Sequence, residues 1–343
     1  MRRCIVIWIS IWISVVAALA TVQDAFAQTL AMTGSALAPD IGFSFVTPLR
    51  CDSHGNIFVR PPLTLGDKNS RSQPPIRKVS ADGKLTATLD LSAAAADGFV
   101  ALSLKTFSVS PDGTLYLFAS AKGSHKPAVV TFDSGGHYSG STILNAEFEP
   151  QQLAVFSDGT FLAAGVALVK APPDPEFAPY LALFDRAGRL VKTIDTGTTD
   201  SSRGLGSAMP RALTLDMAAS DGSYVYLLRQ GAAPTVFVIS NAGVVDRTLT
   251  LSYPNRGAHV TGFWVGGANL LVEFSRQNAM PNGNTAYDLV LYGSQTGDRL
   301  IEYTKGPDSE LQGTLACPDW QGNFTFLSTN LEGTPVLVKA AVR

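Results

Sequence analysis

The chain has 343 residues, of which 45% are hydrophobic and 16% are charged, and its formal net charge is −2. A disordered protein has lower hydrophobicity, and a protein that coats nucleic acid has a strong excess of basic charge, so the composition excludes both classes. Three cysteines are too few for a small scaffold held together by disulfides. The composition therefore predicts a folded globular protein.

The first 27 residues have the order of a secretory signal peptide. Arg2 and Arg3 precede an apolar run, and Ala25-Phe26-Ala27 has the small-residue pattern of a cleavage site. We predict cleavage after Ala27, export to the periplasm or the extracellular space, and no stable membrane insertion of the mature chain. The alternative is an uncleaved anchor, because the apolar run is only slightly shorter than a membrane span.

A pattern of turn and strand recurs six times in the mature chain, residues 28–343. Each instance has a polar turn containing glycine, followed by a run rich in β-branched and aromatic residues. Asp-Gly between two apolar runs predicts a hairpin, in which we expect both turn residues to have positive φ. The steps between the turn glycines are 58, 46, 63, 45 and 55 residues, and the glycines are Gly55, Gly113, Gly159, Gly222, Gly267 and Gly322.

A second kind of hairpin follows each of the first five, as in IRKVSADGKLTATLDL at residues 76–91. Two hairpins make four antiparallel strands, which is one blade of a β-propeller. We therefore predict an all-β fold, a single six-bladed β-propeller of four-stranded antiparallel blades over residues 28–343. The sixth repeat lacks one strand, so residues 28–36 are expected to supply it and to close the ring. A pair of β-sandwiches is the alternative, which the alternation of hairpin types disfavours.

The repeated turn and strand, as in SPDGTLYLFA, resembles the blades of six-bladed propellers of the NHL-repeat and SMP-30-like groups. The resemblance covers nearly the whole mature chain and implies the propeller architecture, without a specific subfamily. The Asp and the Asn-Arg pair that are typical of NHL repeats are missing, and FDRAGRLVKTID is the nearest segment to them. The resemblance therefore transfers no active site.

Cys51 and Cys317 occupy equivalent places, shortly before Gly55 and Gly322, at the end of the innermost strand of the first and last blades. A closed ring brings these two blades side by side. We therefore predict a disulfide that joins them and constrains the unfolded chain. The alternative is two buried thiols that lie too far apart to bond.

Long connections are expected to gather on one face of the ring. They are residues 61–75, 168–179 and 276–286 between second and third strands, and residues 197–210 between two blades. Long loops on a rigid scaffold often carry binding sites, so we predict a ligand or partner surface there. The alternative is tolerated insertion, because surface loops cost little stability.

The sequence contains no GxSxG, HExxH, GxxxxGK[ST] or EF-hand motif, so no catalytic residue, metal ligand or cofactor is predicted. Polar residues at the start of innermost strands would instead surround the mouth of the central channel and orient a polar or anionic ligand. The alternative is that strand ends at a channel mouth are polar because water reaches them. The residues of this predicted site are Lys105, Glu149, Gln151, Arg211, His259 and Glu310.

We predict from these features an exported binding or interaction module that acts through its long-loop face. Its partner would be an unidentified protein or a small polar ligand, and not a nucleic acid. The alternative is a metal-dependent hydrolase or lyase of the six-bladed propeller type, with its site at the channel mouth. In that case the resemblance to SMP-30-like enzymes implies Ca²⁺ held by a pair of carboxylates.

Overall fold

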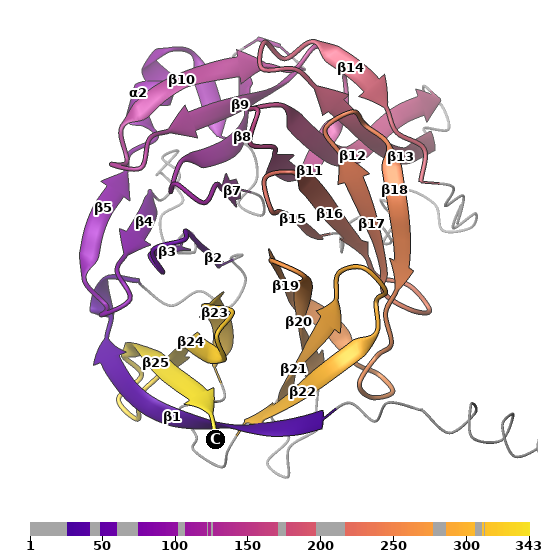
Figure 1. The fold of residues 1–343 in the computed structure, drawn as a ribbon. Coiled ribbons are helices and arrows are strands. Elements are labelled where there is room, and N and C mark those ends of the chain that lie inside the picture. Colours follow the sequence, from indigo (N-terminus) through magenta and orange to yellow (C-terminus); the bar gives the residue numbers. More distant parts are fainter. Residues whose placement is uncertain are drawn as a thin grey trace, which may run out of the picture.

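The computed structural model describes residues 26–41, 49–59, 75–101, 107–121, 123–124, 126–170, 176–196, 217–276, 286–305, 311 and 313–343. These residues form an all-β fold, in which five sheets surround a central axis (Figure 1). Within the same residues, no helix is long and apolar enough to cross a membrane.

Three of the sheets have four strands each, joined in chain order. The first consists of β2 (Arg50–Cys51), β3 (Ile57–Val59), β4 (Ile76–Val79) and β5 (Leu85–Leu89). The second consists of β11 (Glu149–Val155), β12 (Phe161–Lys170), β13 (Glu176–Phe184) and β14 (Leu190–Thr193). The third consists of β15 (Met217–Ser220), β16 (Tyr224–Arg229), β17 (Thr235–Ser240) and β18 (Val245–Thr250).

A fourth sheet has five strands because β8 pairs with two short strands on one side. Its strands are β6 (Phe99–Ala101), β7 (Phe107–Val109), β8 (Leu115–Ala121), β9 (Pro127–Phe132) and β10 (Tyr138–Ile143). The short helix α2 (Ser92–Ala96) precedes β6, and Ala94 buries its side chain against this sheet. Neither α2 nor β6 is expected from the turn pattern, because both lie in a connection between two repeats.

The fifth sheet has eight strands in the order β19-β20-β21-β22-β1-β25-β24-β23. Its first four strands in this order are β19 (His259–Gly266), β20 (Asn269–Arg276), β21 (Ala286–Gly293) and β22 (Arg299–Lys305). The others are β1 (Phe26–Leu37), β25 (Pro335–Val342), β24 (Asn323–Thr329) and β23 (Thr314–Pro318). The 3-10 turn η1 (Pro39–Ile41) follows β1.

The strand β1 is the reason that this sheet is so wide. Its first half, Phe26–Leu30, pairs in parallel with Ile301–Lys305 of β22. Its second half, Leu30–Leu37, pairs antiparallel with β25. Residues 1–25 lie outside the described part of the chain, so the signal peptide stays a prediction. The strand β1 starts at Phe26, two residues before the predicted N-terminus of the mature chain at Gln28.

The prediction of six separate four-stranded sheets is wrong. Four sheets of four or five strands each have the form of a single blade, and the remaining sheet has eight strands. The sequence pattern misses this because the strands of the last two repeats are joined through β1, a segment from the other end of the chain. What the sheets show is an all-β, propeller-like arrangement.

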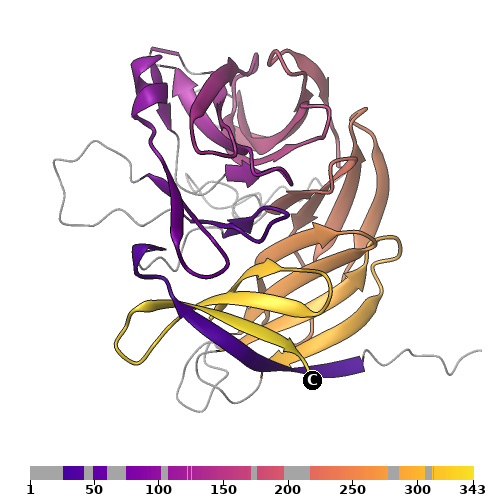
Figure 2. The ribbon, with the colours of Figure 1, turned by 60° about the vertical axis from the view of Figure 1, so that its left-hand side comes forward.

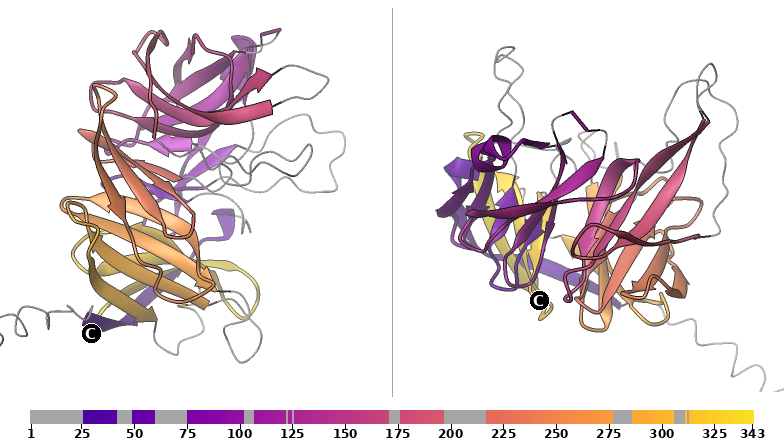
Figure 3. Two further views of the ribbon diagram at one scale, coloured as in Figure 1. Left: turned by 90° about the vertical axis from the view of Figure 1, so that its right-hand side faces the viewer. Right: turned by 90° about the horizontal axis from the view of Figure 1, so that it is seen from above.

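One edge strand of each blade-like sheet, and both end strands of the eight-stranded sheet, lie nearest the axis. Figure 1 shows these inner strands as β2, β7, β11, β15, β19 and β23, and neighbouring ones contact each other along most of the ring. Hairpin turns join first to second and third to fourth strands at one face, the turn face. The other connections leave from the opposite face, the connection face, and Figures 2 and 3 show the ring from its sides.

The expectation of positive φ at both residues of each Asp-Gly turn is also wrong. In the turn before β8, Gly113 has a φ of +85°, whereas Asp112 is not among the residues with positive φ. The Gly113 amide donates to the Ser110 carbonyl, and Ser110 pairs with Thr114. This is a three-residue loop that ends in a left-handed glycine, a longer hairpin than the two-residue type that Asp-Gly suggested.

Buried side chains gather in six clusters among the described residues, and each cluster is built from two neighbouring groups of strands. The middle strands of each group are buried on both faces, as in β16, where Val225 and Leu227 face one cluster and Tyr226 and Leu228 face the next. Alternate residues of a strand point to opposite faces. The core is therefore the series of spaces between adjacent sheets.

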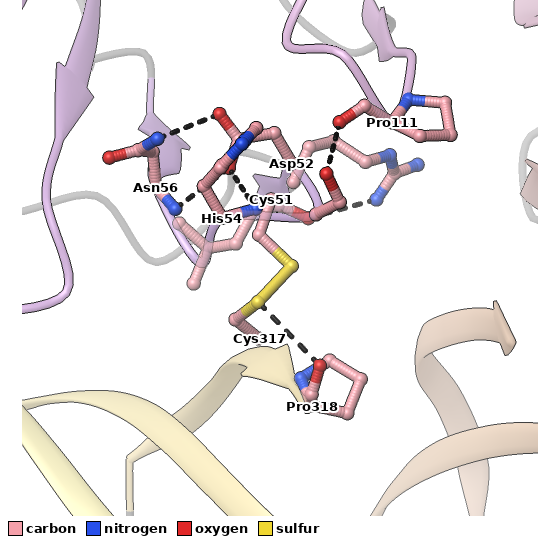
Figure 4. The surroundings of a disulfide bond; sticks show 10 residues. Cys51, Asp52, His54, Asn56, Pro111, Cys317 and Pro318 are labelled. Carbon is pink, nitrogen blue, oxygen red and sulfur yellow. Dashed lines mark hydrogen bonds between the residues drawn. A yellow bond between two sulfur atoms is a disulfide. The ribbon is translucent and has the colours of Figure 1, made fainter. Parts of the chain in front are cut away.

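Cys51 and Cys317 form a disulfide, which confirms the predicted pairing. Their Cα atoms lie 5.7 Å apart although 266 residues separate them in the sequence. Cys51 ends β2 and Cys317 lies in β23, so the bond joins the first sheet to the last strands of the chain (Figure 4). A disulfide is typical of proteins in oxidising compartments outside the cytosol.

Candidate functional site

The sequence-predicted site residues fall into two groups. Lys105, Arg211 and Glu310 lie outside the described residues. Glu149 and His259 are the exposed first residues of β11 and β19, and Gln151 is partly buried in β11. The inner strand β15 lies between β11 and β19 (Figure 1). A shared site at the channel mouth therefore stays a prediction.

A different set of polar groups meets where β20 and β22 face β23. At its centre is Glu273, whose side chain is fully buried. One carboxylate oxygen accepts a hydrogen bond from the Leu315 amide at 2.8 Å, and the other accepts one from Thr261 Oγ1 at 3.1 Å. Glu273 lies in the run NLLVEFSR, where the middle of a buried strand is otherwise apolar. Its carboxylate thus connects β20 to β23, two strands that do not pair with each other.

Lys305 is the cationic member of this set. It ends β22, and its Nζ donates to the Gly313 carbonyl at 2.7 Å. The ammonium group also lies over the Phe326 ring, 4.5 Å from its centroid, and over the Tyr287 ring at 5.0 Å. Aromatic faces attract a cation, so these rings replace part of the water that burial removes.

An ion pair completes the set at the ends of β20 and β21. Arg276 Nε donates to one oxygen of Asp288 at 2.7 Å, and Nη2 donates to the other at 3.2 Å. The hydrogen bond to Asp288 raises the pKa of Arg276. We call the six residues the seam cluster: Thr261, Glu273, Arg276, Tyr287, Asp288 and Lys305.

Burial governs the ionisation of the two central groups. Burial raises the pKa of the Glu273 carboxyl above its usual range, although Lys305 and the Leu315 amide favour the charged form. Burial also lowers the pKa of Lys305 to about 8, against the opposing effect of Glu273 and Asp288. Each shift moves a group toward its neutral form. Lys305 therefore loses its proton at a lower pH than an exposed lysine does.

The seam cluster lies toward the connection face. β20 runs from the turn face at Asn269 to Arg276, and β22 likewise ends at Lys305. Residues 277–285 begin directly after Arg276, and residues 306–310 begin directly after Lys305. The cluster thus fixes the starting points of two connections, through the Arg276–Asp288 pair and the Lys305–Gly313 hydrogen bond.

Sequence reasoning missed this cluster because it looked for polar residues at the starts of inner strands. The available signal was a charged residue within an apolar strand, which is rarely buried without a partner. That signal points to Glu273, but it does not identify Lys305 or Leu315 as partners. No group of three or more His, Cys, Asp or Glu side chains suited to a metal ion occurs in the part of the chain that the structure describes.

Comparisons with known proteins support the fold and leave the function open. No protein-family model matches the sequence, and no curated protein matches it either. A protein of unknown function from Dyadobacter fermentans has a similar structure, with a TM-score of 0.50 and 8% identity over 92% of this chain and 99% of that one.

Two further solved structures are similar at lower scores. Virginiamycin B lyase from Staphylococcus aureus has 12% identity and a TM-score of 0.45 over 92% of this chain and all of that one. A candidate gluconolactonase has 11% identity and a TM-score of 0.47 over 93% of this chain and 95% of that one. Identities this low bear on the fold alone. The description of the fold as propeller-like rests on the arrangement of the sheets.

Proposed function

We propose that this chain is an exported, six-bladed β-propeller that binds a polar small molecule or a protein partner on its connection face. The count of blades, the closure of the ring and the position of the binding face each have separate support from the contacts of the described residues.

The six buried clusters support the count of blades. If the eight-stranded sheet is two blades, β19–β22 and β23–β25 with β1, each cluster fills the space between one blade and the next. The cluster between the last two blades contains Leu271 and Phe326, and the cluster between the last and the first contains Leu337 and Ile57. A ring of six blades has six such spaces, so no blade face is left open.

The turns between third and fourth strands support the same count. In five of them the glycine lies so close to the outermost strand of the preceding blade that a Cβ atom would touch that strand. Gly136 lies against β5, Gly188 against β10, Gly243 against β14 and Gly297 against β18. Gly83, in the first blade, lies against the Leu37 carbonyl of β1. By this rule β1 is the outermost strand of the blade that precedes the first.

Two links support closure of the ring. The strand β1 continues from β22 to β25, so one strand ties the fifth blade to the sixth. The Cys51–Cys317 disulfide ties the sixth blade to the first. Export agrees with this bond, because a disulfide persists in an oxidising compartment.

The seam cluster is the observation that supports a binding site on the connection face. Two connections of the same face start from one set of buried, hydrogen-bonded charges. Buried charges cost free energy unless they are paired, so their position at the base of two connections favours a role in holding those connections in place. Loops held by a rigid scaffold are a common arrangement for recognition.

The test compares two variants on opposite faces. In the first, a short Gly-Ser linker replaces residues 277–285. The second is Val244→Ser, which changes an exposed residue of the turn between β17 and β18, on the turn face. Each immobilised protein is exposed to the exported fraction of the source cells, and captured proteins and small molecules are identified by mass spectrometry.

We expect the wild type and Val244→Ser to capture the same partner, and the linker variant to capture at least tenfold less. Equal capture by all three proteins, or no reproducible capture by the wild type, would contradict the proposal. Conversion of a captured small molecule into a product would instead favour the hydrolase or lyase alternative.

A further inference from the structure

Arg50, at the inner edge of the first sheet, is a cation that forms an ion pair with no carboxylate in the part of the chain that the structure describes. It begins β2, and its side chain is partly buried. Its Nη1 donates to the Leu49 carbonyl at 3.0 Å, and no described carboxylate forms an ion pair with it. Arg276 is also partly buried, but it meets Asp288 with two hydrogen bonds.

Asp52, the carboxylate nearest to Arg50 in the sequence, is occupied by other groups (Figure 4). One oxygen accepts hydrogen bonds from the amides of His54 and Asn56 at 2.9 and 3.0 Å. The other accepts one from Asn56 Nδ2 at 2.8 Å and lies 3.5 Å from Lys78 Nζ. Asp52 therefore neutralises Lys78 and not Arg50.

The direction of the Arg50 side chain follows from its neighbour. Successive residues of a strand point to opposite faces, and Cys51 points to β23, where it bonds Cys317. Arg50 therefore points to the other face of β2, on the side where β7 contacts β2. The sequence segments that directly precede β2 and β7, residues 42–48 and 102–106, contain no Asp or Glu.

The physical consequence is a cation whose charge no described carboxylate neutralises. A guanidinium group has five N–H donors in one plane. In Arg50, the Leu49 carbonyl accepts a hydrogen bond from one of them, on Nη1. Burial lowers the pKa of Arg50 to about 10, so the group remains charged at neutral pH while it has lost part of its hydration. A partly desolvated charge that no described carboxylate neutralises is unfavourable, and binding of an anion removes that cost.

We propose that Arg50 anchors an anion-binding site at the inner edge of β2, for a ligand with a carboxylate or phosphate group. Two oxygens of such a group match the planar fork of a guanidinium. The site lies between the sheet of β2–β5 and the sheet of β6–β10, whereas the seam cluster lies in the eight-stranded sheet. It is therefore independent of the function proposed above, and its test does not depend on the connection face.

The experiment measures anion binding by the full protein at constant ionic strength. Inorganic phosphate and acetate are titrated separately, with sodium chloride as the balancing salt, and affinity is measured by calorimetry and by the shift in thermal unfolding. The variants are Arg50→Gln, Arg50→Lys and the control Arg189→Gln, which removes an equal charge from an exposed turn where the side chain is 79% exposed.

We expect phosphate, acetate or both to bind the wild type and Arg189→Gln with equal affinity, and Arg50→Gln at least tenfold more weakly. Arg50→Lys keeps the charge but loses the fork, so its affinity should fall between the two. The anion that binds more tightly identifies the ligand group. Absence of binding by the wild type to both anions, or equal binding by Arg50→Gln, would overturn the proposal. If Arg50→Gln does not fold, a ¹⁵N NMR titration of the wild-type arginine Nε signals decides the same question.

Discussion

In several hairpin turns, the side chain of the first residue accepts hydrogen bonds from backbone amides of later residues in the turn. The Asp185 carboxylate accepts hydrogen bonds from the amides of Ala187 and Arg189, two and four residues later. Asp and Asn side chains form such bonds readily, which is why they favour turns. The same pattern recurs in turns that start at Asp52, Asp319 and Asn330. A glycine with positive φ then ends each of these turns.

The position of a turn relative to the neighbouring blade decides how costly its glycine is to replace. Gly188 has a φ of +76°, and a Cβ atom there would collide with the Ile143 carbonyl oxygen. Gly333 has a φ of +78° in the same kind of turn, with no atom within 4 Å of the Cβ position. We expect Gly333→Ala to cost about 1 to 2 kcal/mol of unfolding free energy, from backbone strain alone.

Gly188→Ala should cost about 3 kcal/mol or more, because the collision adds to the strain. Urea unfolding of both variants measures the difference. An equal loss of stability in the two would mean that the contact with β10 does not constrain the turn.

The buried pair Glu273 and Lys305 should make stability depend on pH. Lys305 has a pKa of about 8 in the folded protein, against 10.5 without perturbation, so the unfolded chain binds more protons between these values. The free energy of unfolding therefore gains a contribution from Lys305 as the pH rises from about 8 to about 10. Below pH 8 that contribution is absent, because the folded state must then hold a buried ammonium.

Lys305→Met removes this titration, so the stability of the wild type relative to the variant should increase with pH. Urea unfolding at pH 7.5, 9 and 10 measures it. Lys84→Met, at a side chain that is 81% exposed, is the control and should leave the difference constant. Parallel pH profiles for the wild type and Lys305→Met would contradict the assignment of Lys305 as the titrating group.

At the scale of elements, β1 joins two groups of strands, because its first half pairs in parallel with β22 and its second half pairs antiparallel with β25. Leu30 is the residue where they meet, because it pairs with Lys305 of β22 and with Val342 of β25. Its side chain is fully buried in the cluster that also contains Leu271 and Phe326. A single strand thus covers an edge of two groups of strands, which would otherwise expose unpaired backbone.

Leu30→Ala should destabilise the protein by about 2 to 5 kcal/mol, because it leaves a cavity between the two groups of strands. Met32→Ala is the matched control, since Met32 lies two residues later on the same strand and is 39% exposed. Its cost should stay below about 1 kcal/mol. Chemical unfolding measures both. Similar small losses would indicate that β1 is loosely attached and does not tie the two groups together.

At the scale of the whole molecule, the disulfide joins the two ends of the ring. Cys51 and Cys317 are separated by 266 residues, so the bond closes a long loop in the unfolded chain. In the chain-entropy description such a loop is worth about 5 kcal/mol of stability. The inner strands β2 and β23 that carry the cysteines are held side by side by this bond.

The double variant Cys51→Ser/Cys317→Ser should therefore unfold about 5 kcal/mol more easily than the oxidised wild type. Alkylation of the denatured protein followed by mass spectrometry checks the bond itself. Without reductant Cys51 and Cys317 should be protected, and with reductant both should react. Reaction of both without reductant would contradict the bond, and the double variant would then be expected to keep wild-type stability.

The local features of this protein can be predicted from its sequence alone. Turn residues, alternating apolar strands and the two equivalent cysteines all depend on neighbours within a few residues, or on a repeat that can be counted. Periodicity therefore predicted an all-β, propeller-like fold, and the places of Cys51 and Cys317 predicted their bond. The turn type was missed, because Asp-Gly occurs in hairpins of more than one length.

The contacts that join distant segments depend on the folded structure. The parallel pairing of β1 with β22 links residues more than 270 positions apart, and no local pattern encodes it. Glu273 likewise finds the Leu315 amide 42 residues away. Arg50 lacks a carboxylate among the described residues for the same kind of reason, since Asp52 is held by Lys78 and Asn56. Which charges are paired depends on which sheets pack together, and that is fixed only when the chain is folded.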